Sequence, residues 1–183
     1  MKKILLLSGG LDSGYILSTL EEPVFALTFD YGQRHRIEVE YAKDLANRYG
    51  VIEHKIVTID LPFESALTGV DVVSDLPPIV SNRNAIFLSV AAGWAESIGC
   101  RDIYMGANAS DYEDFVDCRP VVLQRLAKAF PYEINVHTPL AEMTKAEVVS
   151  ACFAANFDLH QTMSCYNGNT CGECEPCKAR YGL

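Results

Sequence analysis

The residues near the start of the chain with the clearest chemistry are Ser8 to Ser13, which read SGGLDS. They follow Lys3 to Leu7, whose continuous apolar run predicts a fully buried parallel strand. Residues 14–20 predict the start of a helix with Ser13 as its N-cap. A strand that runs through paired glycines into a helix N-terminus offers N–H groups and a positive dipole to an anion. Because two serines and Asp12 surround the glycines, the pattern favours a phosphate-binding loop over an ordinary tight turn. It is not a Walker A loop, which would end in Gly-Lys-Ser or Gly-Lys-Thr.

A second chemical cluster lies at residues 164–177, SCYNGNTCGECEPC, where four cysteines fall within thirteen residues and three have CxxCxxC spacing. Four thiolates on short loops with Gly and Pro satisfy tetrahedral Zn²⁺. The spacing alone leaves an iron–sulfur cluster open, because C-x2-C-x2-C also begins bacterial ferredoxin motifs. We expect Cys100, Cys118 and Cys152 to be small core residues. The expected metal ligands are Cys165, Cys171, Cys174 and Cys177.

The composition excludes several classes of protein. With 183 residues, 49% of them hydrophobic and 21% charged, the chain is expected to be globular and to bury a proper core. Its net charge of −9 argues against a broad nonspecific nucleic-acid surface, and no nucleic-acid partner is expected. No apolar run approaches membrane-spanning length, and the run after the first lysines is too short for a signal peptide. We therefore predict a cytoplasmic protein, whose cysteines are metal ligands or buried thiols and not disulfides.

The elements that must position these clusters alternate between strands and helices. Residues 61–80 contain several prolines and predict a loop with one or two short helical turns, and residues 107–119 predict a polar loop. The alternation predicts an α/β fold, a doubly wound and mostly parallel five-stranded sheet with right-handed crossovers. We divide the chain into an α/β domain, 1–160, and a metal-binding segment, 161–183, packed on it. The expected strands are 3–7, 24–29, 54–60, 101–105 and 133–139, and the expected helices are 14–20, 37–49 (closed by Gly50), 85–97, 120–130 and 145–156.

This architecture predicts where a ligand binds. In doubly wound sheets, ligands lie beyond the carboxyl ends of the strands, near the point where the strand order reverses. The polar stretches DYGQRH (30–35), SNRN (81–84) and GANASDYEDFVDCR (106–119) follow predicted strands or precede a buried helix. We therefore expect them to meet the SGGLDS loop at one cleft.

Taken together, these segments resemble the 7-cyano-7-deazaguanine synthase (QueC-like) family of the ATP pyrophosphatase, or PP-loop, superfamily. SGGLDS fits the superfamily's SGGxDS loop, whereas FDYGQRH and SCYNG with CGECEPC are much more specific. The resemblance implies a Rossmann-like fold of the adenine nucleotide alpha-hydrolase type with a C-terminal four-cysteine zinc knuckle. The matching pieces span most of the chain: SGGLDS (8–13), FDYGQRH (29–35), RN (83–84), DCR (117–119), TPL with KAE (138–147), and SCYNG with CGECEPC (164–177).

The resemblance implies an ATP-dependent ligase of queuosine biosynthesis, with ATP, Mg²⁺ and Zn²⁺ as cofactors and a homodimer as its assembly. In this family the carboxylate of 7-carboxy-7-deazaguanine is adenylated, ammonia displaces AMP to give an amide, and a second activation dehydrates the amide to the nitrile. Adenylation turns a poor leaving group into a good one. Positive charge and N–H donors stabilise the phosphoryl transition state. No covalent nucleophile is evident among the motifs.

The resemblance also implies roles for individual residues. For Arg83 and Lys145 the alternative is a surface cation, for His35 a structural histidine, and for the acidic substrate loop a solvated surface. The expected catalytic residues are Asp12, Arg83 and Lys145; the expected ATP-binding residues are Ser8, Gly9, Gly10, Leu11, Asp12 and Ser13; the expected substrate-binding residues are Gln33, Arg34, His35, Asp111, Asp117 and Arg119.

The chain departs from the family pattern near the substrate. Ser81-Asn82 stands where a Pro-Gly usually precedes the Arg-Asn pair, and Ala109 stands where a Glu often occurs. A variant that stops at the amide, or that uses a related deazapurine, therefore stays open. So do a PP-loop tRNA-thiolating enzyme with an iron–sulfur cluster and a noncatalytic nucleotide sensor.

Overall fold

The computed structural model describes residues 1–33, 36–62, 80–112, 115–165, 171–174, 177–178 and 180. Its centre is a five-stranded parallel sheet with the strand order β3-β2-β1-β4-β5. The doubly wound parallel sheet expected from the alternation of elements is thereby confirmed. The strands are β1 (Lys3–Leu6), β2 (Val24–Asp30), β3 (Glu53–Thr58), β4 (Asp102–Tyr104) and β5 (Asn135–His137).

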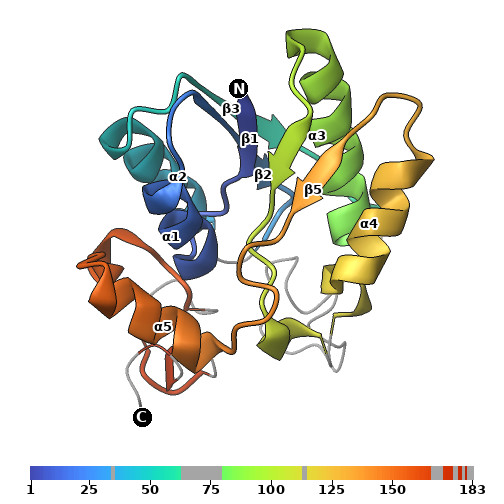
Figure 1. Ribbon diagram of the computed structural model, residues 1–183. Helices are drawn as coiled ribbons and strands as arrows, with labels where there is room; N and C mark the ends of the chain where they lie inside the picture. Colours follow the sequence, from blue (N-terminus) through green and yellow to red (C-terminus); the bar gives the residue numbers. More distant parts are fainter. Residues whose placement is uncertain are drawn as a thin grey trace.

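Helices cover both faces of the sheet, and α3 and α4 lie on the opposite side from α1, α2 and α5 (Figure 1). Short 3-10 helices η1 (Ala109–Asp111), η2 (Val116–Cys118) and η3 (Leu159–Gln161) occur in the connections. No helix in the described ranges is both long and apolar enough to cross a membrane. The α-helices are α1 (Leu11–Thr19), α2 (Ile37–Arg48), α3 (Arg83–Ile98), α4 (Pro120–Ala129) and α5 (Lys145–Ala154).

The continuous apolar run of β1 is explained by a core on each side of the sheet. Ile4 packs with α3 and α4, whereas Leu5 and Leu7 pack with α1, α2 and α5. Strand β2 is buried along its whole length. A strand buried on both faces needs apolar residues at nearly every position, and this makes both strands readable from sequence. The polar residue inside β2, Thr28, donates its hydroxyl to Leu7 O.

The strand order reverses between β1 and β4, which are neighbours in the sheet but lie about a hundred residues apart in the chain. Lys3 of β1 pairs with Val24 of β2 on one side and with Asp102 of β4 on the other. The connections that leave β1 and β4 run in opposite directions, so a crevice opens at their carboxyl ends. The SGGLDS loop begins at this point.

Several local predictions need correction. Helix α1 begins at Leu11 with Gly10 as its N-cap, so the prediction of Ser13 as N-cap is wrong. Residues 107–119 contain η1 and η2, where a loop was expected. Helix α2 ends at Arg48, and Gly50 follows its C-cap with a left-handed φ of 64°. Most of the predicted 61–80 loop, residues 63–79, lies outside the described residues.

Candidate active site

The SGGLDS loop is held in shape by its two serines. Ser13 Oγ accepts from Ser8 N at 3.1 Å and donates to Gly10 O at 3.2 Å. Ser8 Oγ accepts from Gly10 N at 3.1 Å and lies 3.0 Å from Ser13 Oγ. Because the hydroxyl hydrogen of Ser13 already goes to Gly10 O, Ser8 is the donor in the hydrogen bond between the two hydroxyls. Because Ser13 folds back onto Ser8, it organises the loop from inside the helix instead of capping the helix.

Glycines let the loop approach its neighbours closely. Gly9 has a φ of +85°, and a Cβ there would lie 2.1 Å from the backbone oxygen of Glu38 in α2. A Cβ on Gly106, just after β4, would lie 3.1 Å from Ser13 N. Gly9 requires glycine, because a side chain would push the loop away from α2, and Gly106 lets the start of α1 lie close to the end of β4.

The beginning of α1 offers donors to an anion. Among the described residues, the amides of Asp12 and Ser13 have no hydrogen-bond partner, and they lie in the first turn of the helix. Free amides at the positive end of a helix dipole bind phosphate oxygens. The loop therefore has the donor arrangement expected from its sequence.

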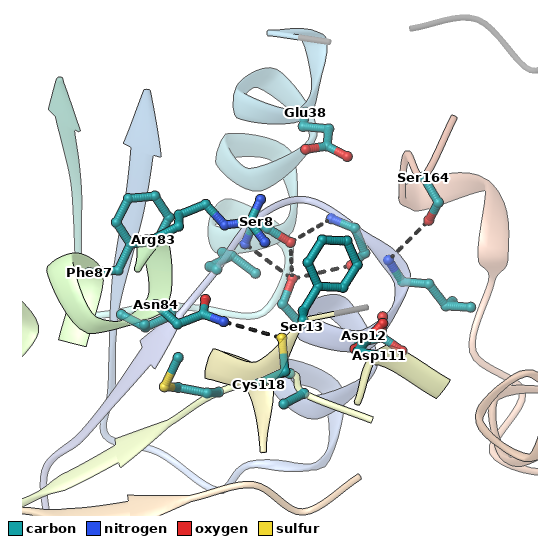
Figure 2. Close-up of a pocket in the computed structure, with 18 of the residues that line it drawn as sticks. Ser8, Asp12, Ser13, Glu38, Arg83, Asn84, Phe87, Asp111, Cys118 and Ser164 are labelled. Atoms are coloured by element: carbon teal, nitrogen blue, oxygen red, sulfur yellow. Dashed lines mark hydrogen bonds between the residues drawn. The ribbon is translucent and has the colours of Figure 1, made fainter. Parts of the chain in front are cut away.

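The loop faces a cavity of about 600 Å³ at the switch point between β1 and β4 (Figure 2). The cavity is lined by segments from across the chain, as predicted for the polar stretches. They are the loop itself, the end of β2 (Phe29, Tyr31, Gln33), the start of α3 (Arg83, Asn84, Phe87), the segment after β4 (Met105 to Ala107, Ser110, Asp111), η2 (Phe115, Cys118), the start of α5 (Thr144 to Ala146) and Ser164.

Aromatic side chains form one wall of the cavity. The rings of Phe29 and Phe87 are stacked with centroids 3.9 Å apart, and Tyr31 lies 5.5 Å from Phe87. Arg83 donates to Tyr31 Oη at 3.1 Å. Burial acts to lower the pKa of Arg83, but the hydroxyl of Tyr31 and nearby acidic groups outweigh it and raise the pKa, so the guanidinium stays charged. A flat wall beside a fixed cation suits a heteroaromatic ring joined to an anion.

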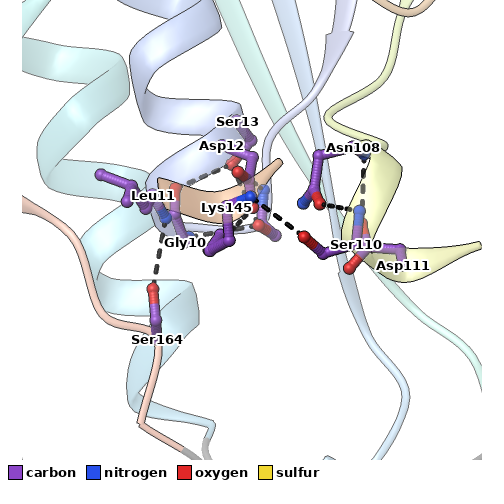
Figure 3. Close-up of polar contacts among 10 residues, drawn as sticks. Gly10, Leu11, Asp12, Ser13, Asn108, Ser110, Asp111, Lys145 and Ser164 are labelled. Atoms are coloured by element: carbon purple, nitrogen blue, oxygen red, sulfur yellow. Dashed lines mark hydrogen bonds and ion pairs between the residues drawn. The ribbon is translucent and has the colours of Figure 1, made fainter. Parts of the chain in front are cut away.

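Three charged groups of the cavity, Lys145, Asp12 and Asp111, lie beside the phosphate loop (Figure 3). Lys145, at the start of α5, forms an ion pair with Asp12 Oδ2 and donates its backbone N–H to Ser110 Oγ at 3.0 Å. Burial raises the pKa of Asp111, and the charge of Asp12 adds to this effect. Asp12 Oδ1 is buried and has no partner among the described residues. An unpaired carboxylate oxygen next to a second carboxylate fits a divalent cation with oxygen ligands such as Mg²⁺.

Several of the expected substrate-binding residues lie outside the cavity or already have hydrogen-bond partners within the protein. Gln33 reaches the cavity, but its amide is engaged with the backbone of Phe29 and Tyr31. Asp117 does not line the cavity, since it accepts from Asn84 N at 3.0 Å at the start of α3. Arg119 is exposed and donates to the backbone oxygen of Tyr112 at 2.9 Å. Arg34 and His35 lie outside the described residues, and their roles stay predictions.

Cys118 lies at the cavity, although the sequence predicted only a small core residue there. Asn84 Nδ2 donates to its Sγ at 3.2 Å. Burial, followed by the charges of Asp111 and Asp117, raises the pKa of Cys118 to about 12. The group is therefore a neutral thiol at physiological pH and a poor nucleophile. The DCR segment (117–119) was a signal for this position, but its Asp and Arg were expected to meet the substrate and its Cys was not.

The four expected ligands in the cysteine cluster lie together. The Sγ atoms of Cys165, Cys171, Cys174 and Cys177 are all within 4.8 Å of one another. Two of the pairs, 171–177 and 165–174, measure 4.0 and 3.9 Å. Four sulfurs around one tetrahedral ion with bonds of about 2.3 Å lie roughly 3.8 Å apart. The geometry of the cluster thus fits a single four-coordinate metal ion.

Hydrogen bonds prepare one of these thiols to bind a metal. Cys174 N donates to Cys171 Sγ at 3.4 Å. Backbone N–H groups from Cys174 and Glu173 lower the pKa of Cys171 to about 6, which favours the thiolate. The cluster packs against the body of the protein through Met163 and the side chain of Tyr41 in α2.

Comparison with known proteins identifies the family of this chain. Residues 2–182 match the family described as queuosine biosynthesis protein QueC. The chain belongs to the QueC family. Because the match extends over nearly the whole chain, the resemblance inferred from the phosphate loop and the cysteine cluster is confirmed.

Relatives of this QueC-family chain carry a specific activity in their names. A protein from Nitrosococcus oceani named 7-cyano-7-deazaguanine synthase is 39% identical over 204 residues, which cover 98% of this chain and 91% of that protein. A protein of the same name from Cupriavidus pinatubonensis is 40% identical over 205 residues, with the same coverage.

Solved structures share the fold of the QueC-family chain at low identity. The U34-tRNA thiolase NcsA from Methanococcus maripaludis matches with a TM-score of 0.58 and 17% identity, over 91% of this chain and 60% of that one. The NH3-dependent NAD synthetase from Campylobacter jejuni matches with a TM-score of 0.56 and 18% identity, over 87% of this chain and 66% of that one. These likenesses support the PP-loop fold and nothing finer.

Proposed function

We propose that this protein is a 7-cyano-7-deazaguanine synthase, which uses ATP and ammonia to convert 7-carboxy-7-deazaguanine into the nitrile. The observation that carries the proposal is the agreement of relatives with this name over 98% of the chain at 38–40% identity. The cavity supports it, because a phosphate loop, two cations and an aromatic wall line one pocket.

The phosphate loop would bind the pyrophosphate part of ATP. The amides of Asp12 and Ser13, at the positive end of α1, would donate to phosphate oxygens. The interlocked Ser8 and Ser13 hold the loop rigid, so its donors need not reorganise during the reaction. The carboxylate of the substrate would attack the α-phosphorus, and pyrophosphate would leave along the loop.

Two cations that line the cavity would stabilise the developing charge. Lys145 is held in place by Asp12, and Arg83 by Tyr31. Mg²⁺ would be held by Asp12 Oδ1, and it would supply positive charge to the phosphates when bound. The substrate carboxylate is itself the nucleophile, so the reaction requires none from the protein, and the protonated Cys118 would not act as one. Catalysis would rest on positioning and electrostatics.

The aromatic wall would hold a planar base. The stacked Phe29 and Phe87 provide an apolar face, and Arg83 at its edge would keep an attached phosphate or carboxylate directed toward the loop. Among the predicted substrate residues, Asp111 has the position that supports contact with the donor edge of a deazaguanine. Roles for Gln33, Arg34, His35, Asp117 and Arg119 remain part of the proposal.

The metal at the cysteine cluster would be a structural zinc ion. The short separations between the sulfurs support one ion, since in a [4Fe–4S] cluster each thiolate binds a different iron and the sulfurs lie further apart. The pure protein is expected to be colourless and to contain one zinc per chain. A brown protein with visible absorbance would favour the tRNA-thiolating alternative.

The decisive test is turnover by the purified protein of 7-carboxy-7-deazaguanine, ammonium and ATP, with AMP, pyrophosphate and the base followed by mass. AMP together with the nitrile is the expected result. AMP with only the amide would identify a variant that omits the second activation, in keeping with Ala109 and Ser81-Asn82. Binding of ATP without release of AMP from any acid would favour a nucleotide sensor.

We also propose that the enzyme works as a homodimer in the cytoplasm and binds no nucleic acid. Clustered thiolates need a reducing compartment, and a net charge of −9 disfavours a broad surface for nucleic acid. Light scattering on the purified protein should give twice the mass of one chain. A monomer that turns over normally would contradict the dimer while leaving the activity unaffected.

A further inference from the structure

A short segment, residues 162–165, connects the phosphate loop to the cysteine cluster. Met163 N donates to Gly9 O at 2.9 Å, and Ser164 Oγ accepts from Leu11 N at 3.4 Å (Figure 3). The next residue, Cys165, belongs to the cluster. The phosphate loop near the start of the sequence is therefore in contact with Met163 and Ser164, which immediately precede the proposed metal ligand Cys165.

Ser164 is also part of the cavity wall, and its hydroxyl lies near the N-terminus of α1 (Figure 2). Its oxygen accepts from the amide of the first residue of the helix, Leu11. A hydroxyl that accepts one bond still has its own hydrogen to donate, and no acceptor for that hydrogen is found in the part of the chain that the structure describes. Ser164 thus adds a donor beside the free amides of Asp12 and Ser13.

The position of this segment depends on contacts at both of its ends. Arg180, beyond the last cysteine, donates from Nη1 to the backbone oxygen of Thr162 at 2.9 Å. Met163 and Cys165 are buried together with Cys177 and pack against Tyr41 of α2. Secondary structure contributes little here, since the residues from 162 to 165 belong to no helix or strand. Cross-linking four thiolates through one ion would hold this irregular segment against the loop.

We propose that Ser164 positions the phosphates of ATP and that metal bound at the cysteine cluster keeps Ser164 in place. The two ligands then reinforce each other, because each stabilises the conformation in which residues 162–165 lie against the loop. This inference rests on the proposed binding of ATP at SGGLDS. By linkage, the factor by which the metal tightens nucleotide binding equals the factor by which nucleotide tightens metal binding.

The first measurement is the affinity of the metal-loaded protein for α,β-methylene-ATP with excess Mg²⁺, by calorimetry, in wild type, Ser164→Ala and Ser150→Ala. Ser150 is an exposed serine on α5 whose hydroxyl donates to Ala146 O of the same helix, and it serves as the matched control. Loss of one hydrogen-bond donor should weaken binding by about 3- to 10-fold in Ser164→Ala. Ser150→Ala should bind like the wild type, and metal content should be equal in all three.

The second measurement is the transfer of metal from the protein to a chromogenic chelator, with and without saturating nucleotide. In wild type and Ser150→Ala, nucleotide should lower the amount of metal transferred. In Ser164→Ala this protection should shrink toward zero. Because this assay starts from the folded, loaded protein, it does not depend on a stable metal-free form.

Two results would overturn the inference while leaving the proposed function standing. One is unchanged nucleotide affinity in Ser164→Ala, and the other is equal protection of the metal with and without the Ser164 hydroxyl. Failure of the loaded wild-type protein to bind nucleotide at all would overturn both the inference and the proposed function.

Discussion

Replacing Gly9 with alanine tests whether the phosphate loop is held directly against α2. An L-residue at a φ of +85° costs about 1–2 kcal/mol. The added Cβ would also lie 2.1 Å from Glu38 O and 3.0 Å from Ala42 N, so α2 or the loop must move by about 1 Å. Overpacking of this kind costs a further ~1–3 kcal/mol. We therefore expect Gly9→Ala to lower the free energy of unfolding by about 2–5 kcal/mol.

Gly99→Ala separates the two contributions. Gly99 follows α3 with a φ of +66°, and nothing lies within 4 Å of the Cβ it would gain, so only the backbone cost of ~1–2 kcal/mol remains. Urea denaturation of the wild type and both variants measures the difference. In a chain of this size the melting temperatures of the two variants should differ by roughly 2–12 °C. Equal destabilisation by both substitutions would refute the close approach of the loop to α2.

Three further predictions concern the cavity. Lys145→Met should lower kcat for AMP release by about 10²–10³, the usual cost of removing a group that stabilises transition-state charge; a kcat within threefold of the wild type would contradict its role. Asp111→Asn should abolish turnover yet raise the melting temperature of the ligand-free protein at pH 7. Burial raises the pKa of Asp111 in the folded protein above its unfolded value of about 3.9. The wild type therefore has the full stabilisation by protonated Asp111 below the unfolded pKa, and it loses this stabilisation as the pH rises through the raised folded pKa. The gain in the variant should therefore disappear as the pH is lowered toward 4 in a series of thermal melts, and a gain that persists there would contradict the burial argument. Cys118→Ser should keep AMP release within about threefold of the wild type, because a thiol with a pKa of about 12 is not the nucleophile; loss of all turnover in a folded variant would reverse that conclusion.

The sheet could be predicted from sequence because its central strands are buried on both faces. Ile4 to Leu7 and Val24 to Phe29 are apolar at every position but Thr28, whose hydroxyl donates to Leu7 O, and such runs are hard to mistake. The alternation with amphipathic and buried helices then leaves few arrangements that obey right-handed crossover. The place of the phosphate loop at the point of strand reversal follows from this topology.

Local rules failed where tertiary contacts decide the structure. Ser13 has the residue type of an N-cap, but the left-handed turn at Gly9 lets α1 begin at Leu11, and the hydroxyl bonds inside the loop. Cys118 and Ser164 reach the cavity through contacts far away in sequence, to Asn84 and to Leu11. The spacing of residues within either segment does not predict these long-range contacts. The cysteine cluster could therefore be predicted from sequence, but its contact with the phosphate loop could not.

The contact between residues 162–164 and the SGGLDS loop also bears on how the protein matures during synthesis. The loop leaves the ribosome early, but Lys145 and Ser164 emerge more than a hundred residues later. At translation rates of about 5–20 residues per second, the delay is roughly 7–30 s. During that interval Asp12 has no lysine beside it, and Leu11 N lacks its acceptor. A nascent chain would thus have most of its strands available for folding before it has the residues that complete the phosphate site.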